Sequence, residues 1–187
     1  NGASCLNLRQ IERFLEDFKS EKKNYQLGGL CKIKHKSHFF IVDTDKPPKK
    51  KFSKSYQSGP LSFEYFLDGI KIITNSGFGS HISKKAELFS RLTACQSTLN
   101  INDTSVTKFE RNEIINKVFG NSIQNSFKSF DFFSKNESDI IGCSASNNGY
   151  EKNFGCTHIR EIYIDKKNSY LKGIDHIFKV KDGYPIR

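Results

Sequence analysis

The spacing of apolar residues changes once along the chain. In residues 6–19, "LNLRQIERFLEDFK", apolar side chains recur every three or four positions between charged ones, as at Leu8, Ile11 and Leu15, which predicts an amphipathic helix. After "LGG" at residues 27–29, apolar and polar residues alternate with a period of two, which is typical of β-strands. The pattern therefore predicts one short helix followed by β-structure.

Strand-like segments follow one another at short intervals. Residues 30–45 alternate until the Pro47-Pro48 pair, which ends the run because proline cannot donate a ladder hydrogen bond. Residues 61–74 predict a hairpin, since Asp68-Gly69 between β-branched and aromatic runs favours a two-residue turn. Further strands are expected in residues 97–105 and, as a pair joined by a polar turn near 166–169, in residues 160–180.

These short strands and regularly spaced turn signals indicate two packed sheets and not an α/β layer. We therefore expect an all-β fold, an antiparallel β-sandwich preceded by one short amphipathic helix. Residues 112–138 fit both an irregular loop and a short helix, and we expect them to be mostly loop.

Composition places the chain among single soluble domains. A chain of 187 residues with 17 Phe can fill one sizeable core. No apolar run is long enough for a membrane-spanning helix, so no membrane association is expected. The 5 cysteines are odd in number and lack metal-ligand spacing, so they indicate neither a zinc ribbon nor a disulfide framework and are expected to be small buried residues.

The net charge of +10 suggests a polyanionic partner, which could be nucleic acid, an acidic polysaccharide or a membrane surface. An AT-rich coding sequence would also raise the lysine content, but it explains less well the cluster "KPPKKKFSK" at residues 46–54. Binding of nucleic acid is not favoured, because the aromatic stretch "YQSGPLSFEYF" at residues 56–66 lacks interleaved basic residues.

The sequence contains none of the common catalytic motifs. It has no Gly-rich phosphate loop, no HExxH and no GxSxG. Within one strand, His35 and His38 would point to opposite faces and so would not form a metal-binding pair. His158 and His176 are expected to be polar surface or capped core histidines.

Motifs in three stretches resemble, in order, a known family. They are "GPLSFEYFLDGIKIITNSG" (59–77), "SRLTACQSTLNINDTS" (90–105) and "NNGYEKNFGCTHIREIYIDKKNSYLKGIDHIF" (147–178). Together they resemble the C-terminal β-sandwich region of the heparinase II/III-like family, particularly a branch found in alphaproteobacteria. The resemblance implies that residues 25–187 form a supersandwich-like domain and that residues 1–24 hold the terminal helix of an absent α-toroid and a linker.

The best-studied members of this family are polysaccharide lyases that act on polymers containing uronic acid. Elimination requires a neutralised carboxylate, a base for the C5 proton and an acid for the leaving oxygen. The family supplies much of this machinery from its toroid, which lies outside this sequence. The resemblance therefore implies that this chain alone does not turn over substrate.

The resemblance also places the family's functional histidines and metal ligands on this chain. The catalytic sandwich histidine falls at Ser55, and the three zinc ligands fall at Gln57, Asn75 and Gln96. Because neutral amides are poor zinc ligands, we expect no metal and no other cofactor. We expect the three amides to join their strands through hydrogen bonds instead, the alternative being three separate solvated side chains.

Further positions are assigned by the same resemblance. Asn147 replaces a family histidine, and the matching Tyr150 could serve a site or be a core aromatic whose hydroxyl is satisfied. Arg91 could bind a sugar carboxylate or sulfate, or form a salt bridge to a neighbouring acid. The expected substrate-binding residues are Tyr56, Gln57, Arg91, Lys49, Lys50, Lys51 and His158.

The leading hypothesis is the C-terminal domain of a polysaccharide lyase-like protein that acts on or binds an acidic, uronate-containing polysaccharide, sulfated polymers included. The alternative is a non-catalytic polyanion-binding or cell-envelope structural protein, which the missing histidines favour. A third hypothesis, nucleic-acid binding, rests on charge alone. The expected partners are the polysaccharide and the toroid of the same parent chain. The family implies the periplasm or cell envelope of a bacterium and leaves the cytoplasm open.

Overall fold

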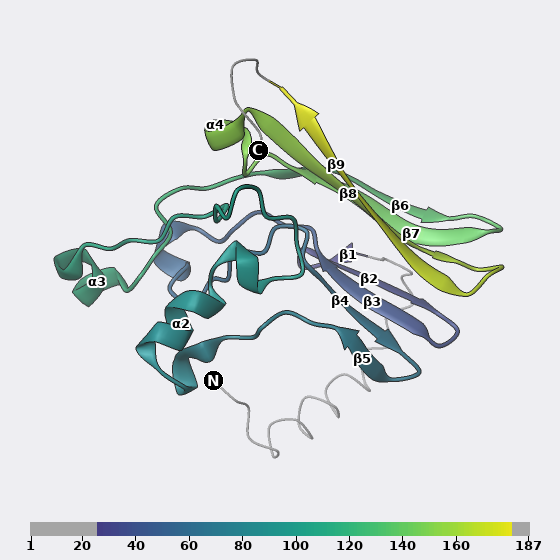
Figure 1. Cartoon of the computed structure of the whole chain (residues 1–187), viewed down its shortest axis with the longest axis horizontal. Helices are drawn as coiled ribbons and strands as arrows, with labels where there is room; N and C mark the ends of the chain where they lie inside the picture. Colours follow the sequence, from purple (N-terminus) through teal and green to yellow (C-terminus); the bar gives the residue numbers. More distant parts are fainter. Residues whose placement is uncertain (1–25, 181–187) are drawn as a thin grey trace.

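The chain folds into two antiparallel sheets that pack face to face (Figure 1). The computed structural model describes residues 26–180, so the helix predicted for residues 6–19 lies outside the described residues. The first sheet contains, in spatial order, β1 (Gln26–Leu27), β2 (Leu30–His35), β3 (His38–Asp43), β4 (Phe63–Leu67) and β5 (Ile70–Ile73). The second contains β6 (Ser129–Asn136), β7 (Ile140–Asn147), β8 (Cys156–Asp165) and β9 (Tyr170–Lys179). The predicted β-sandwich is confirmed.

Two turns with left-handed backbone set the registers of the first sheet. Asp68 and Gly69 have φ values of 51° and 77°, the conformation of a type I′ turn, and they pair Leu67 with Ile70 as the sequence predicts. A second turn follows His35 and begins at Lys36, whose φ is 50°. Residues 30–45 are therefore a hairpin and not one strand.

This hairpin corrects the prediction for the two histidines. His35 and His38 are directly paired across β2 and β3, so their side chains lie on the same face of the sheet and not on opposite faces. His38 is buried and its Nδ1 lies 2.8 Å from the hydroxyl of Tyr65. The pair is thus part of the sheet's packing.

Strands β6 and β7 were not recognised in the sequence. Residues 112–138, which were expected to be mostly loop, contain the short helix α3 (Glu113–Phe119) and the whole of β6. Conversely, the strand expected in residues 97–105 does not form: Ile101 and Thr104 make an isolated bridge around a turn in which Asn102 and Asp103 have positive φ. The polar turn between β8 and β9 is confirmed.

The core lies between the sheets and follows the period-two pattern. In β3 and β8 every second residue is buried. The core side chains are Cys31, Ile33, Phe40, Val42 and Tyr65 from the first sheet and Ile141, Cys143, Ile162 and Ile164 from the second. Cysteines 31, 143 and 156 are buried and free, as expected from their isolated spacing, whereas Cys95 is half-buried.

Loops and short helices gather at one end of the sandwich, opposite the tips of the β2–β3 and β4–β5 hairpins (Figure 1). These helices are η1 (Lys50–Phe52), η2 (Gly79–His81), α2 (Lys84–Ser90), η3 (Thr93–Cys95), α3 and α4 (Glu151–Phe154). None of the described helices is long and apolar enough to cross a membrane. Most of the candidate functional residues lie in or next to this loop end.

Candidate functional site

Arg91 is a structural residue of the loop end. Its side chain is 0% exposed; Nε donates to the carbonyl of Tyr56 at 2.9 Å and Nη2 to the carbonyl of Ser53 at 2.9 Å. The guanidinium lies 4.0 Å from the centre of the Phe109 ring, and burial lowers the pKa of Arg91 to about 10. The side chain of Arg91 does not reach solvent, where it could bind a sugar carboxylate or sulfate, and within residues 26–180 it forms no ion pair with an acid. Both predictions for Arg91, ligand binding and a salt bridge, are therefore wrong in this structure.

Lys49, Lys50 and Lys51 are exposed on the segment that Arg91 holds. We name residues 46–54 the lysine loop. Ser53 fixes it: its hydroxyl donates to the carbonyl of Lys50 at 2.7 Å and accepts from the backbone N–H of Ile123 at 2.9 Å. Lys51 extends over the ring of Phe52, 4.7 Å from its centre. The loop thus presents exposed ammonium groups from a backbone fixed by hydrogen bonds, and clustered positive charge of this kind attracts a polyanion.

Tyr56 and Gln57 follow the lysine loop and are half-buried. Burial, and secondly the charge of Asp43, raises the pKa of Tyr56, while burial raises the pKa of Asp43 to about 6. The Tyr56 hydroxyl is therefore neutral at physiological pH and can donate a hydrogen bond but cannot act as a base. A role in orienting substrate remains a prediction for both residues.

The former metal positions are joined differently from expectation. Oδ1 of Asn75 accepts from the backbone N–H of Ser97 at 2.8 Å, while Nε2 of the buried Gln96 donates to the carbonyl of Ser90 at 2.7 Å. Asn75 therefore lies beside the residue that follows Gln96, but no hydrogen bond within residues 26–180 joins any two of the three amides. The predicted direct amide network is wrong, and Ser97 makes the connection.

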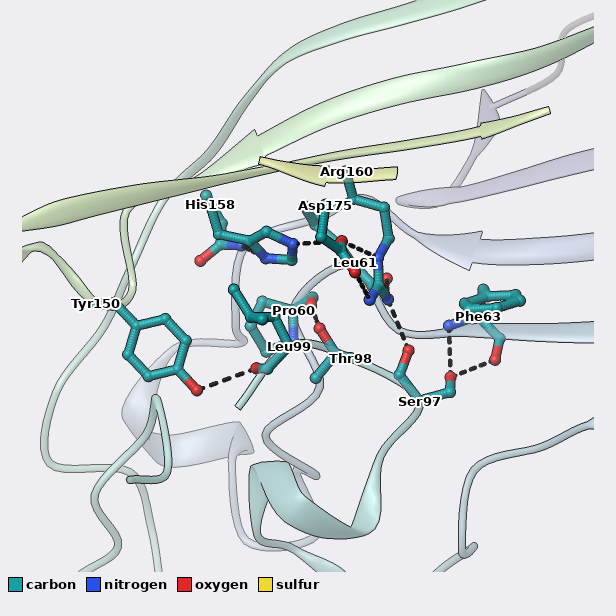
Figure 2. Close-up of polar contacts among 11 residues, drawn as sticks. Pro60, Leu61, Phe63, Ser97, Thr98, Leu99, Tyr150, His158, Arg160 and Asp175 are labelled. Atoms are coloured by element: carbon teal, nitrogen blue, oxygen red, sulfur yellow. Dashed lines mark hydrogen bonds and ion pairs between the residues drawn. The ribbon is translucent and has the colours of Figure 1, made fainter. Parts of the chain in front are cut away.

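Ser97 also ties the loop to β4. Its hydroxyl accepts from the backbone N–H of Phe63 at 2.8 Å and contacts the carbonyl of Phe63 (Figure 2). The backbone N–H of Asn75 reaches the carboxylate of Glu64 at 3.4 Å, and Lys71 pairs with the same carboxylate at 3.1 Å. The strand ends are held by amide, hydroxyl and carboxylate groups.

These residues do not fit the family's zinc ion. An imidazole or carboxylate at the three positions would supply lone pairs, whereas the Asn75 oxygen already accepts a backbone N–H and Gln96 directs its nitrogen at a carbonyl. In residues 26–180 no group of three or more His, Cys, Asp or Glu side chains is arranged to hold a metal. That the protein uses no metal or other cofactor remains a prediction.

An ion pair between the buried Arg160 and the partly exposed Asp175 joins the second sheet to this loop. Arg160 on β8 pairs with Asp175 on β9 through two contacts, Nε to Oδ1 at 2.7 Å and Nη2 to Oδ2 at 2.9 Å (Figure 2). Its Nη1 donates to the carbonyls of Leu61 at 2.8 Å and Ser97 at 2.6 Å. One guanidinium thus fixes both the β8–β9 ladder and the loops of the first sheet.

His158 completes this cluster and is not free to bind substrate. It is 1% exposed, and its Nε2 lies 2.7 Å from Oδ1 of Asp175. Because Oδ1 of Asn147 accepts from the N–H of Gly149 at 3.1 Å, Nδ2 of Asn147 donates to Nδ1 of His158 at 3.0 Å. Nε2 therefore carries the proton of the neutral ring. The substrate-binding prediction for His158 is wrong in this structure, and the capped core histidine is the correct interpretation.

Tyr150 is a core aromatic with a satisfied hydroxyl. The hydroxyl donates to the carbonyl of Leu99 at 3.0 Å or that of Thr104 at 3.1 Å, and it accepts from the N–H of Ile101 at 3.3 Å. Burial raises its pKa to about 12. Since the ring is buried, Tyr150 shapes the 99–104 turn and does not reach a ligand.

The fold and these contacts define a class of protein: a two-layer antiparallel β-sandwich whose loop end is fixed by buried Arg, His and amide side chains and carries an exposed basic loop. A comparison with protein families identifies it further. The model of the family "Heparinase II/III-like, C-terminal" matches residues 19–186, and the chain belongs to this family. No curated protein and no solved structure matches the chain. The domain is thus related to polysaccharide lyases, while its assignment to the alphaproteobacterial branch remains a prediction.

Proposed function

We propose that this domain binds an acidic, uronate-containing polysaccharide, sulfated polymers included, as the C-terminal domain of a polysaccharide lyase-like protein. The observation that carries the proposal is the lysine loop. Lys49, Lys50 and Lys51 are exposed and consecutive, and none of them has an ion pair within 4 Å among the described residues. A fixed row of unpaired cations suits a polymer with regularly spaced carboxylate or sulfate groups.

The buried contacts of Arg91 strengthen this proposal. Arg91 holds the C-terminal end of the loop through the carbonyl of Ser53 and the chain just after it through the carbonyl of Tyr56. A loop held in this way loses little conformational entropy when a ligand binds, so more of the electrostatic attraction appears as affinity. The binding role accordingly belongs to the lysines of the loop and not to Arg91 or His158.

We propose that the isolated domain is not catalytic. His158 has both ring nitrogens occupied, and Ser55 stands where the resemblance places the catalytic histidine. The second candidate function, a non-catalytic polyanion-binding or structural protein of the cell envelope, has the same binding surface and is favoured by the engaged state of His158. Incubating the full-length parent with uronate polymers and following the absorbance of the unsaturated product separates the two.

The family resemblance is the basis for a proposed partner and a proposed compartment. We propose that an N-terminal α-toroid of the same parent chain forms the other wall of the polysaccharide cleft. We propose the periplasm or cell envelope of a bacterium as the compartment, on the ground of the family resemblance alone.

The binding proposal is tested with heparin as the probe. Replacing Lys49, Lys50 and Lys51 by Gln removes three exposed charges, and we expect the affinity to fall about tenfold and its salt dependence to weaken. The matched control replaces Lys32, Lys34 and Lys36, three exposed lysines on and just after β2, by Gln. Equal losses in the two variants would mean that only the net charge matters, and the proposal would then fail.

A further inference from the structure

A large groove adjoins the lysine loop. It has a volume of about 1020 Å³, and its wall is formed by some of the residues in each of three segments, 88–94, 100–111 and 116–124, with Arg91 and Ser122 not among them. This volume lies at the upper end of the range for ligand sites. None of the sequence-predicted site residues lines it.

The groove wall carries polar groups that the protein leaves unused. Among residues 26–180, the side chains of Lys108, Arg111 and Asn121 make no hydrogen bond or ion pair, and Lys108 and Arg111 are exposed. Oδ1 of Asn100 and Oδ1 of Asn116 are buried in the wall without a partner. Nδ2 of Asn116 donates to the carbonyl of Glu110 at 3.2 Å, which fixes the amide so that its oxygen is the unpaired atom.

Unpaired buried acceptors are uncommon, because each costs free energy unless water or a ligand satisfies it. The groove thus combines unused acceptors, an unused amide and two unpaired cations. Sugar hydroxyls both donate and accept hydrogen bonds, and uronate or sulfate groups pair with cations. An acidic glycan matches all three kinds of group.

The groove and the lysine loop adjoin each other and are joined by direct contacts. The backbone N–H of Ile123 donates a hydrogen bond to the hydroxyl of Ser53, and the side chain of Lys54 lies against Gly120. The positive charge of Lys50 also interacts electrostatically with the carboxyl group of Glu110, which lines the groove. A polymer bound at the lysine loop therefore lies next to the groove.

We propose that this groove is a glycan subsite, in which sugar rings of an acidic polysaccharide bind through Asn121 and the wall amides while Lys108 and Arg111 pair with carboxylate or sulfate groups. The inference rests on the proposed function, since the lysine loop supplies the first contact with the polymer. The groove would contribute binding free energy that does not depend on the lysines of the lysine loop.

The variants Asn121→Ala and Arg111→Gln test the subsite, because neither side chain has a described partner whose loss would disturb folding. The probe is a heparin hexasaccharide, titrated calorimetrically at low and moderate salt. We expect Asn121→Ala to lower the affinity about fivefold, the loss of about one hydrogen bond, without changing the salt dependence. Arg111→Gln should lower both the affinity and the salt dependence.

Ser122→Ala is the matched control. Ser122 neighbours Asn121, is fully buried, has an unpartnered hydroxyl and does not line the groove, so its variant should bind like the wild type. Wild-type affinity in Asn121→Ala and Arg111→Gln, with a loss only in the lysine-loop variant, would overturn the subsite and leave the proposed function standing. Absence of wild-type binding to the hexasaccharide would overturn both, and equal effects with a DNA duplex would overturn the glycan identity.

Discussion

Replacing Arg160 by Leu is the most demanding test of how this domain holds its loop end together. The substitution removes the paired contacts to Asp175 and both hydrogen bonds from Nη1, which join β8 to the carbonyls of Leu61 and Ser97. It leaves a carboxylate without its arginine and two loop carbonyls without their donor. The loops of the first sheet should therefore separate from the second sheet more easily.

The magnitude follows from burial. Removing one partner of a buried ion pair typically costs about 3–5 kcal/mol. The Asp175 side chain is 35% exposed, so water partly solvates the carboxylate left behind, and we expect a loss of about 2–3 kcal/mol in the free energy of unfolding. For a domain of this size the melting temperature should fall by about 4–12 °C.

The effect should depend on pH. Burial alone would raise the pKa of Asp175, but hydrogen bonds from Arg160 and His158 outweigh it and hold the pKa well below its ordinary value. A carboxyl with a lowered folded-state pKa stabilises the fold above its unfolded pKa of about 3.9 and loses that contribution as the pH falls through the folded value. The difference between wild type and Arg160→Leu should therefore be largest near neutral pH and shrink below about pH 4.

Urea denaturation, followed by tyrosine fluorescence at several pH values, measures this difference. The control is Lys71→Met, which removes the exposed partner of Glu64 and leaves that carboxylate its hydrogen bonds to Thr74 and Asn75, so it should cost less than about 1 kcal/mol. A loss in Arg160→Leu no larger than that of the control, or one that does not change with pH, would refute the role assigned to the Arg160 cluster.

Three further predictions concern the loop end. The triple variant Gln57→His, Asn75→Asp and Gln96→His restores the ligands that the family resemblance implies, and we expect it to bind one zinc ion per chain in a chelator-competition titration. A triple variant that folds but binds no zinc would show that the three positions do not converge. Asp43→Asn should raise the free energy of unfolding by about 1 kcal/mol at pH 8 and leave it unchanged at pH 4. Burial raises the folded-state pKa of Asp43 to about 6, so the protonated carboxyl is favoured in the folded state and this contribution to stability is lost as the pH rises through that value. Equal melting temperatures of the variant and the wild type at pH 8 would contradict the prediction. Arg91→Met should destabilise the protein by about 2–4 kcal/mol and speed tryptic cleavage in the lysine loop, and unchanged cleavage of the folded variant would argue against Arg91 as the anchor.

Parts of the fold could be predicted because the signal is local. The Asp68-Gly69 turn needs positive φ at both residues, which this residue pair favours. In β8 the alternation of residues along the strand matches its alternating burial. Strand β6 was missed because it is an edge strand, and its Phe130 and Phe133 are exposed, so neither face follows a buried pattern. Strand β7 is buried on both faces and contains Gly and Ser, which gives no alternation to detect.

The candidate site was predicted less well than the fold. The exposed lysines are evident from composition, since a consecutive run of long cations cannot be buried. The engagement of Arg91 and His158 depends on partners far away in the sequence, such as the carbonyl of Ser53 for Arg91 and the carboxylate of Asp175 for His158. The groove was missed for the same reason, because its wall is assembled from three separate segments.

The sequence by itself determined the sandwich, the hairpin turn, the basic loop and, through its motifs, the family, because each is encoded by neighbouring residues. Only the tertiary structure decided which polar residues are free. Arg91, His158 and Asn75 have the side chains of a binding site, but the folded chain surrounds them with its own donors and acceptors, and a group that has already found a buried partner is not available to a ligand.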